Sequence, residues 1–282
     1  MKKGFIFVWI GVLFAIMCVT TTGCKDTKPA EDSLAVDTTS VDSLETEEDM
    51  IAETPMPKAA DELFDDFIFN FSANKKLQMS RITFPLPIIK NGVQEKMIQK
   101  NNWKMDNFFM RQDFYTLIFN SEKQLGLDKD TAVNHAVIEH VVFKTKTVKQ
   151  YVFNRVNGLW KMTSLEYSPI SKNLNASFLE FYNRFSIDKD FQQKSMASQV
   201  SFTCPDPDDD FEQMTGTFIP EQWPAFAPDF LPSGSLWNIV YGNNYTKSNR
   251  VVFVMRGIAN GLEIWMTFRK SGQTWKLVKL NT

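Results

Sequence analysis

The sequence predicts an α+β chain in which two tandem cone-like domains follow a signal peptide and a disordered linker. Each domain is expected to be an N-terminal helix packed on a curved antiparallel sheet. Three observations predict this: an apolar N-terminus, an acidic stretch without aromatic residues, and an internal match between the two halves. The chain has 282 residues, 43% of them hydrophobic, and is long enough to bury two cores. The expected segments are 1–24, 25–58, 59–170 and 171–282.

The N-terminal segment MKKGFIFVWIGVLFAIMCVTTTGC has two lysines, an apolar run from Phe5 to Val19, and small residues leading to Gly23 and Cys24. The run is too short for a membrane span and fits a signal peptide. The segment resembles a bacterial lipoprotein signal, in which Gly23 and Cys24 match the lipobox and Thr21 stands where Leu is usual. This resemblance implies cleavage before Cys24, lipidation of its thiol, and an outer membrane lipoprotein with a periplasmic or cell-surface face. The alternative is an ordinary secretory peptide with an incidental cysteine.

Residues 25–58 carry ten acidic and three basic residues and no aromatic residue. Such a segment cannot bury enough apolar surface to fold, so we expect a disordered tether. The tripeptides DSL, DTT and DSL begin at Asp32, Asp37 and Asp42. They resemble the acceptor of Bacteroidota-type O-glycosylation, and the alternative is that they only solvate the tether.

The formal net charge of −2 and the lack of a Lys/Arg cluster argue against a nucleic-acid partner. We find no nucleophile elbow, phosphate loop, zinc-ligand spacing or dinucleotide fingerprint, and we expect no cofactor. Once the signal is removed, Cys24 and Cys204 are the remaining cysteines. Because Cys24 would be acylated, no disulfide is expected within one chain.

The two halves of the chain match in the same order over more than ninety residues. ELFDDFIFNFSANKKLQMS aligns with SFLEFYNRFSIDKDFQQKS, FYTLIFN with LWNIVYG, and VVFKTK with VVFVMR. A colinear series of matches indicates an internal duplication. Each copy opens with apolar residues at helical spacing: Leu63, Phe64, Phe67, Ile68 and Phe71, then Phe178, Phe181, Tyr182 and Phe185. Short β-branched and aromatic runs follow, and GVQEKMIQKNNW, up to Trp103, is predicted to be helical.

Each copy closes on a predicted hairpin. Asn157-Gly158 is a type I′ turn signal that pairs Arg155 with Trp160. In the second copy, a three-residue loop at 271–273 would place Arg269 opposite Trp275. The hairpin ending in Gly-x-Trp-Lys resembles the closing strands of the nuclear-transport-factor-2-like, or cystatin-like, cone. The whole chain resembles an uncharacterised family of Bacteroidota lipoproteins with two such domains, and this resemblance implies a fold and no established activity.

The histidines, His135 and His140, lie five residues apart on a predicted strand and therefore point to opposite faces. His135 shares its face with Glu139, so a His/Glu acid-base pair is one hypothesis. The other is that both residues are inert on a solvated strand edge.

Two further segments are candidate sites. The run CPDPDDDFE spaces carboxylates as a weak Ca²⁺ site could, although a solvated turn is the favoured interpretation. Its candidate ligands are Asp206, Asp208, Asp210 and Glu212. The segment PEQWPAFAPDFLP is stiffened by proline, and its aromatic residues either pack the second domain or form a rim that stacks on a ligand. The predicted ligand-binding residues are Trp103, Trp223, Phe226 and Phe230.

We therefore expect a lipid-anchored, non-catalytic binding or interaction protein that recognises a small molecule, glycan or protein partner. One alternative is a small-molecule hydrolase or isomerase that uses His135 and Glu139. Another is a structural envelope protein without a ligand. The sequence leaves open the identity of the ligand, the oligomeric state and whether the tether is glycosylated.

Overall fold

The computed structural model describes residues 61–206, 208–209, 211–242 and 246–282. The predicted signal peptide, the tether and Cys24 lie outside the described residues, as does Asp210. No helix in the described part of the chain is both long and apolar enough to cross a membrane.

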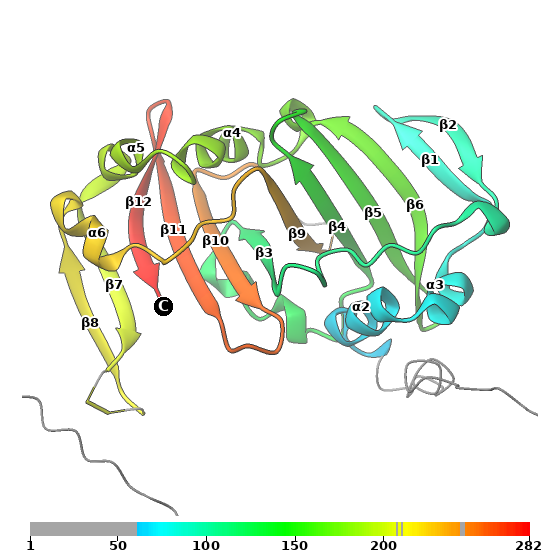
Figure 1. Cartoon of the computed structure of the whole chain (residues 1–282), viewed down its shortest axis with the longest axis horizontal. Coiled ribbons are helices and arrows are strands. Elements are labelled where there is room, and N and C mark those ends of the chain that lie inside the picture. Colours follow the sequence, from blue (N-terminus) through cyan, green and yellow to red (C-terminus); the bar gives the residue numbers. More distant parts are fainter. Residues whose placement is uncertain (1–60, 207, 210, 243–245) are drawn as a thin grey trace, which may run out of the picture. The chain divides into compact units, whose positions relative to one another are not determined.

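Each half of the described chain opens with two helices and contains six strands, and the second half has a further short helix (Figure 1). The first half comprises α2 (Phe64–Ala73), α3 (Lys75–Arg81), β1 (Leu86–Lys90), β2 (Val93–Ile98), β3 (Phe114–Phe119), β4 (His135–Val142), β5 (Thr147–Val156) and β6 (Leu159–Pro169). The second comprises α4 (Ala176–Phe185), α5 (Lys189–Lys194), β7 (Met196–Pro205), β8 (Gln213–Phe218), α6 (Trp223–Phe226), β9 (Ser235–Tyr241), β10 (Arg250–Gly257), β11 (Glu263–Ser271) and β12 (Thr274–Asn281). Short 3₁₀ turns lie at Lys100–Asn102, Glu122–Gln124, Leu127–Lys129, Ile170–Lys172 and Pro220–Gln222.

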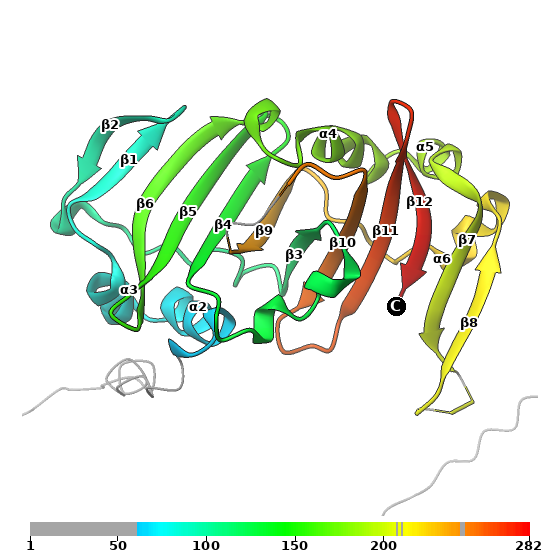
Figure 2. The ribbon, with the colours of Figure 1, turned by 180° about the vertical axis from the view of Figure 1, so that it is seen from behind.

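All twelve of these strands form one mixed sheet, in the order β2-β1-β6-β5-β4-β9-β3-β10-β11-β12-β7-β8 (Figure 2). The expected α+β class is confirmed, whereas the expected antiparallel sheets are wrong in part. The pairs β1–β6, β3–β9 and β7–β12 are parallel. The predicted division at residues 170 and 171 stays a prediction.

The two central strands are exchanged between the halves. β9 of the second half pairs antiparallel with β4 of the first, and β3 of the first half pairs antiparallel with β10 of the second. β3 and β9 meet in a parallel pair at the centre, with Thr116 beside Asn238. Each half therefore completes its sheet with a strand of the other.

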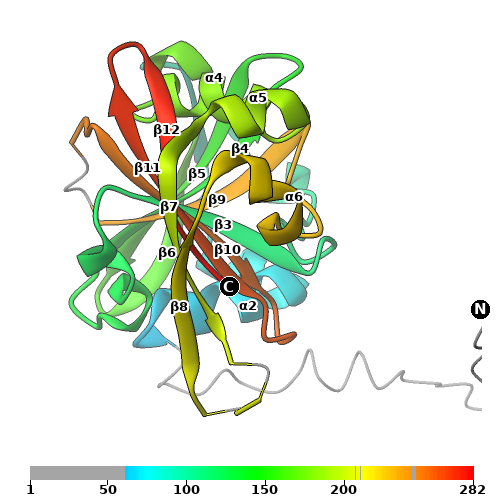
Figure 3. The ribbon, with the colours of Figure 1, turned by 90° about the vertical axis from the view of Figure 1, so that its left-hand side faces the viewer.

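The two hydrophobic cores lie on opposite faces of this sheet. Val252 and Val254 of β10 belong to the core under α2, whereas Val251, Phe253 and Met255 belong to the core under α4. Successive side chains of a strand point to opposite faces, so the alternation separates the two cores. Figure 3, seen from the β8 end, shows the twist from strand to strand and places α4 and α2 on different sides.

The hairpin predicted at Asn157-Gly158 is confirmed, with both residues at positive φ and Arg155 opposite Trp160. The Arg155 guanidinium lies 5.1 Å from the Trp160 ring centroid. In the second copy the expected register is wrong. The loop is two residues long, because Gly272 takes a φ of 61° at its first position, and Lys270 rather than Arg269 faces Trp275.

The predicted helix up to Trp103 is also wrong. Asn91 and Gly92 have φ values of 51° and 84°, which turn the chain back so that Val93–Ile98 pairs with β1 as a strand. Pairing with the neighbouring strand outweighs the local helix propensity of this segment.

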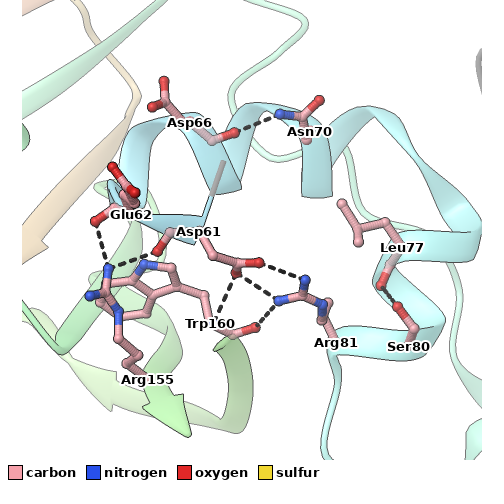
Figure 4. A network of polar contacts seen from close by, with 9 residues as sticks. All are labelled: Asp61, Glu62, Asp66, Asn70, Leu77, Ser80, Arg81, Arg155 and Trp160. Carbon is pink, nitrogen blue, oxygen red and sulfur yellow. Dashed lines mark hydrogen bonds and ion pairs between the residues drawn. The ribbon is translucent and has the colours of Figure 1, made fainter. Parts of the chain in front are cut away.

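A polar network ties the first hairpin to the helices (Figure 4). The two terminal guanidinium nitrogens of Arg81 donate to the Asp61 carboxylate, each at 2.7 Å. The Trp160 backbone N–H donates to the same carboxylate at 3.2 Å. Arg155 donates to the backbone carbonyls of Asp61 and Glu62 at 2.8 and 2.6 Å. These bonds satisfy backbone groups just before α2 and fix the start of that helix.

A second network fixes α2 to the exchanged strands. The Asp65 carboxylate accepts hydrogen bonds from Tyr115 of β3 at 3.0 Å and from Tyr241 of β9 at 2.5 Å. Burial raises the pKa of Asp65 from 3.8 to about 6, although the two tyrosine hydrogen bonds lower it in part.

We predict that neither half folds alone, because each lacks one central strand. Fragments 59–170 and 171–282, produced separately, should give poorly dispersed NMR spectra and no cooperative thermal transition. Co-expression should restore the spectrum of the whole chain. A cooperative transition in either isolated fragment would contradict the role assigned to the exchange.

We also predict that Asp65→Asn changes the pH dependence of stability. Because the folded pKa of Asp65 is raised, the stability contributed by the protonated carboxyl is full below about pH 4 and is lost as the pH rises through about 6. The loss is at most roughly 3 kcal/mol, less where water reaches the carboxylate. Urea unfolding at pH 4.5 and 7.5 should show wild type losing stability relative to Asp65→Asn, and parallel pH profiles would contradict this.

Candidate functional site

A row of aromatic and cationic side chains crosses five strands on the face of the sheet that carries the first core. Consecutive members are register partners: Trp237 with His140, His140 with Lys149, Lys149 with Tyr167, and Tyr167 with Lys90. At about 4.8 Å per strand the row spans roughly 19 Å. We call these five residues the cross-strand row.

The His140 and Trp237 rings in the row are stacked, with centroids 4.2 Å apart and an interplanar angle of 4°. Lys149 Nζ donates to the Tyr151 hydroxyl at 2.5 Å and lies 3.5 Å from an Asp106 carboxylate oxygen. The Tyr151 hydroxyl in turn donates to Asp106. Thus Tyr151 links a cation in the row to a carboxylate behind it.

A buried glutamine holds Asp106 in place. Gln78 of α3 donates to the Asp106 carbonyl at 2.6 Å and accepts from the Asp106 backbone N–H at 3.3 Å. The indole N–H of Trp103 donates to the same glutamine oxygen at 3.1 Å. Helix α3 and strand β5 are therefore connected through Asp106 in the loop before β3, the helix to its backbone and the strand to its carboxylate.

Burial lowers the pKa of His140, and the neighbouring Lys149 lowers it further, whereas Asp106 opposes both effects. Burial also lowers the pKa of Lys149, opposed by Asp106. The pKa of Tyr151 is raised, chiefly by burial and then by the charge of Asp106. At neutral pH the row therefore offers a neutral imidazole beside a lysine whose charge is stabilised by one carboxylate.

An open cavity of about 640 Å³ continues the row at its β1 end. We call it the lysine cavity; its lining includes Ile88, Lys90, Glu95, Lys96, Lys146 and Tyr167. Lys90 lies 3.5 Å from Glu95. Among the described residues no ion pair joins Lys96 or Lys146 to a carboxylate, so two lysines remain available to an anion.

Residues 42–282 match the family described as "Domain of unknown function (DUF4348)". The chain belongs to the DUF4348 family. Among solved structures it is similar to an NTF2-like protein from Bacteroides fragilis, with 36% sequence identity and a TM-score of 0.73. The match covers 80% of this chain and 98% of the other. The comparison with curated proteins gave no match.

The expected NTF2-like resemblance is thus confirmed for this DUF4348 protein at the level of fold. The Bacteroidota lipoprotein assignment is finer than these findings and stays a prediction.

The structure places His135 and His140 on opposite faces of β4, as the spacing predicts. His135 and Glu139 share a face, but four residues of extended strand separate their Cα atoms by roughly 13 Å. Glu139 accepts hydrogen bonds from three side-chain amides, and His135 bonds to Asn154. The structure therefore shows no contact between the members of the predicted acid-base pair.

The predicted aromatic residues do not gather at one site in this DUF4348 protein. Trp223 is buried and donates from its indole N–H to Gln192 at 2.8 Å, the counterpart of the Trp103–Gln78 bond. Phe226 stacks on Phe218 with centroids 4.4 Å apart. Phe230 is 43% exposed and lies against Phe114 of β3. A ligand-binding role for these residues stays a prediction.

The described residues of the acidic run from Asp206 onward lie between β7 and β8. The Asp206 carboxylate accepts from the backbone N–H of Asp208 at 2.9 Å, and the Asp206 backbone N–H donates to the Glu212 carbonyl at 3.0 Å. Within the described residues, which omit Asp210, no group of three or more His, Cys, Asp or Glu residues could hold a metal ion.

Sequence reasoning did not identify Lys149, Tyr151, Tyr167 or Trp237 as candidate residues. The spacing of Lys149 and Tyr151, two residues apart, indicates only that their side chains share one face of a strand. Only the order and register of strands far apart in the sequence bring Lys149, Tyr167 and Trp237 into one row.

We predict that His140 titrates below its usual pKa of 6.5. Lys149→Met should raise this pKa because a neighbouring cation is removed, and Asp106→Asn should lower it further. NMR titration of the imidazole Cε1–H signals measures both shifts. His135→Asn assigns the two histidine signals. An unchanged His140 pKa in both variants would show that these groups do not act on the imidazole.

Proposed function

We propose that this DUF4348 protein is a non-catalytic binding module of the cell envelope that recognises an anionic glycan. A lipid on Cys24 would anchor it to the outer membrane, with the folded part on the periplasmic or cell-surface side. The observation that carries the binding proposal is the cross-strand row, together with the lysine cavity at its end.

The chemistry of the row suits an acidic sugar. The half-buried rings of Tyr167 and Trp237 offer apolar surface for a sugar ring, while Lys90 and Lys149 attract its negative substituent. Binding sites commonly combine such apolar surface with a few convergent polar groups. The register of the sheet spaces these groups without any induced change, which limits the entropy lost on binding.

The lysine cavity supports the same ligand class. Lys96 and Lys146 are exposed and carry no ion pair among the described residues, so an anion does not have to displace a protein carboxylate. An exposed ammonium group contributes modestly, at about 0.2–1 kcal/mol, and its effect falls with salt. Several such groups acting together provide selectivity for charge.

The proposal is tested by titrating the purified full-length chain with an oligogalacturonate and with its neutral methyl ester, using calorimetry at about 20 and 150 mM salt. We expect the acid to bind more tightly than the ester, with affinity falling at the higher salt. The double variant Lys96→Ala/Lys146→Ala should weaken binding of the acid by roughly five- to ten-fold.

A matched control is Lys189→Ala/Lys194→Ala, which removes two exposed lysines from α5 in the other half. This control should bind the acid as wild type does. Equal affinity for acid and ester, or equal losses in both double variants, would contradict a glycan site at the lysine cavity. No binding of either sugar would favour the structural alternative.

A further inference from the structure

A second cleft, of about 240 Å³, lies on the opposite face of β4 from the cross-strand row. His135, Val137 and Glu139 line it, and they alternate along β4 with the first-core residues Ala136 and Ile138. Its other wall includes residues 172–175, just before α4, and its floor reaches Val240 and Gly242 of the β9 segment. We call it the acceptor cleft.

A buried carboxylate forms the deep end of the acceptor cleft. Glu139 is 4% exposed and lines the cleft. One carboxylate oxygen accepts from Gln150 at 2.9 Å and Asn173 at 2.8 Å, and the other accepts from Asn238 at 2.9 Å. A carboxylate offers about four lone-pair positions. Three donors therefore leave one acceptor position open on Glu139.

A neighbouring acceptor also has no donor. The side-chain carbonyl oxygen of Asn238 is buried and has no hydrogen-bond partner in the described part of the chain. Asn238 pairs in register with Glu139, and its amide nitrogen donates to that carboxylate. Buried polar atoms are rarely left unpaired, because leaving one without a partner destabilises the folded state. Next to the open position on Glu139 there is thus one buried carbonyl oxygen without a donor among the described residues.

The polar contacts of His135 define its tautomer. Asn154 donates from its amide nitrogen to Thr163 at 2.7 Å, so its carbonyl oxygen faces His135 Nδ1 at 2.8 Å. The Thr163 hydroxyl donates onward to the Val152 carbonyl at 3.3 Å. Nδ1 of a neutral His135 therefore carries the proton, and Nε2 presents a lone pair. In that tautomer Nε2 is a further acceptor on a residue that lines the cleft.

A cationic side chain also lines the acceptor cleft. Lys172 lines the cleft, is exposed, and has no ion-pair partner among the described residues. Asn175 also lines the cleft, and the structure gives its side-chain amide no partner within the described residues. The cleft therefore combines a buried carboxylate, an exposed ammonium group and an unengaged amide.

We propose that the acceptor cleft binds a small zwitterion of the amino acid or dipeptide class. The ligand's ammonium group donates to the open position on Glu139, and its carboxylate pairs with Lys172. The Asn175 amide is placed to bond to a peptide group between them. The cleft has the volume of about eight water molecules at ~30 Å³ each, which suits one dipeptide-sized molecule. The cross-strand row lies on the opposite face of the sheet, and Ser168 is the one described residue that lines both the acceptor cleft and the lysine cavity.

The test is NMR titration of the purified full-length chain with alanyl-alanine, N-acetyl-alanyl-alanine and alanyl-alanine amide. We expect alanyl-alanine to bind and to shift signals of residues 172–175. Blocking either terminus should weaken binding by roughly ten-fold, because each block removes one charged hydrogen-bonding partner.

Two variants test the recognition of each end of the ligand separately. Lys172→Ala should remove the preference for the free carboxylate, and Glu139→Gln should remove the preference for the free amine. Lys189→Ala, which removes an exposed lysine from α5 outside both proposed sites, is the matched control for Lys172→Ala and should bind alanyl-alanine as wild type does. If Glu139→Gln fails to fold, Lys172→Ala still decides the result, since that side chain is exposed.

The proposal would be overturned by an absence of shifts at millimolar alanyl-alanine. It would equally be overturned by equal affinity for the blocked and free dipeptides, or by a Lys172→Ala variant that keeps its preference for the free carboxylate. Loss of oligogalacturonate binding with intact dipeptide binding would count against the glycan site alone.

Discussion

The pairing of β3 with β10 and of β9 with β4 is the constraint on which the rest of the structure depends. The exchange turns two copies of one fold into a single sheet. Asp65 of helix α2 accepts hydrogen bonds from one tyrosine on each exchanged strand, which holds both strands to that helix. Because both strands carry residues of both cores, neither core is complete without the other half.

One sheet with two exposed regions explains the chemistry of the candidate sites. On β4, even-numbered positions lead from the first core to His140 and the cross-strand row. Odd-numbered positions lead to His135, Glu139 and the acceptor cleft. Trp237 and Asn238 of β9 continue the same division, one residue to each face. This pair of strands therefore supplies the stacked His140 and Trp237 rings of the cross-strand row on one side and hydrogen-bond acceptors on the other.

The sequence allowed the duplication, the α+β class and the first hairpin to be predicted, because periodicity and turn signals are local. Asn157-Gly158 sufficed for the register of β5 and β6 from the turn to Phe153, but not for the shift between Val152 and Phe153 that precedes it along β5. The segment after Gly92 was predicted to be a helix because its pairing with β1 is a tertiary effect. The exchange left no local signal, since β3 and β9 have the same pattern whichever neighbour they pair with.

The candidate sites could be predicted only in fragments, for the same reason. The opposite faces of His135 and His140 follow from their spacing. The partners of these residues come from β5, β6, β9 and the segment before α4, and no pattern in the sequence brings those together. The Trp103–Gln78 and Trp223–Gln192 bonds repeat in both halves. This repetition indicates that the indole N–H groups of Trp103 and Trp223 serve as hydrogen-bond donors to buried glutamine side chains.

The strand exchange also sets the order of events as the chain is made. By Pro169 the first half has its helices and the five strands that pair with one another, β1, β2 and β4–β6. The edge of β4 stays unpaired until Tyr241, at the end of β9, has been made. At bacterial synthesis rates of about 5–20 residues per second, the segment from β3 to β9 takes on the order of ten seconds. Throughout that time an unpaired strand edge and an uncovered apolar face are exposed to the surroundings. The sheet of the first half is therefore completed only when most of the chain has been made.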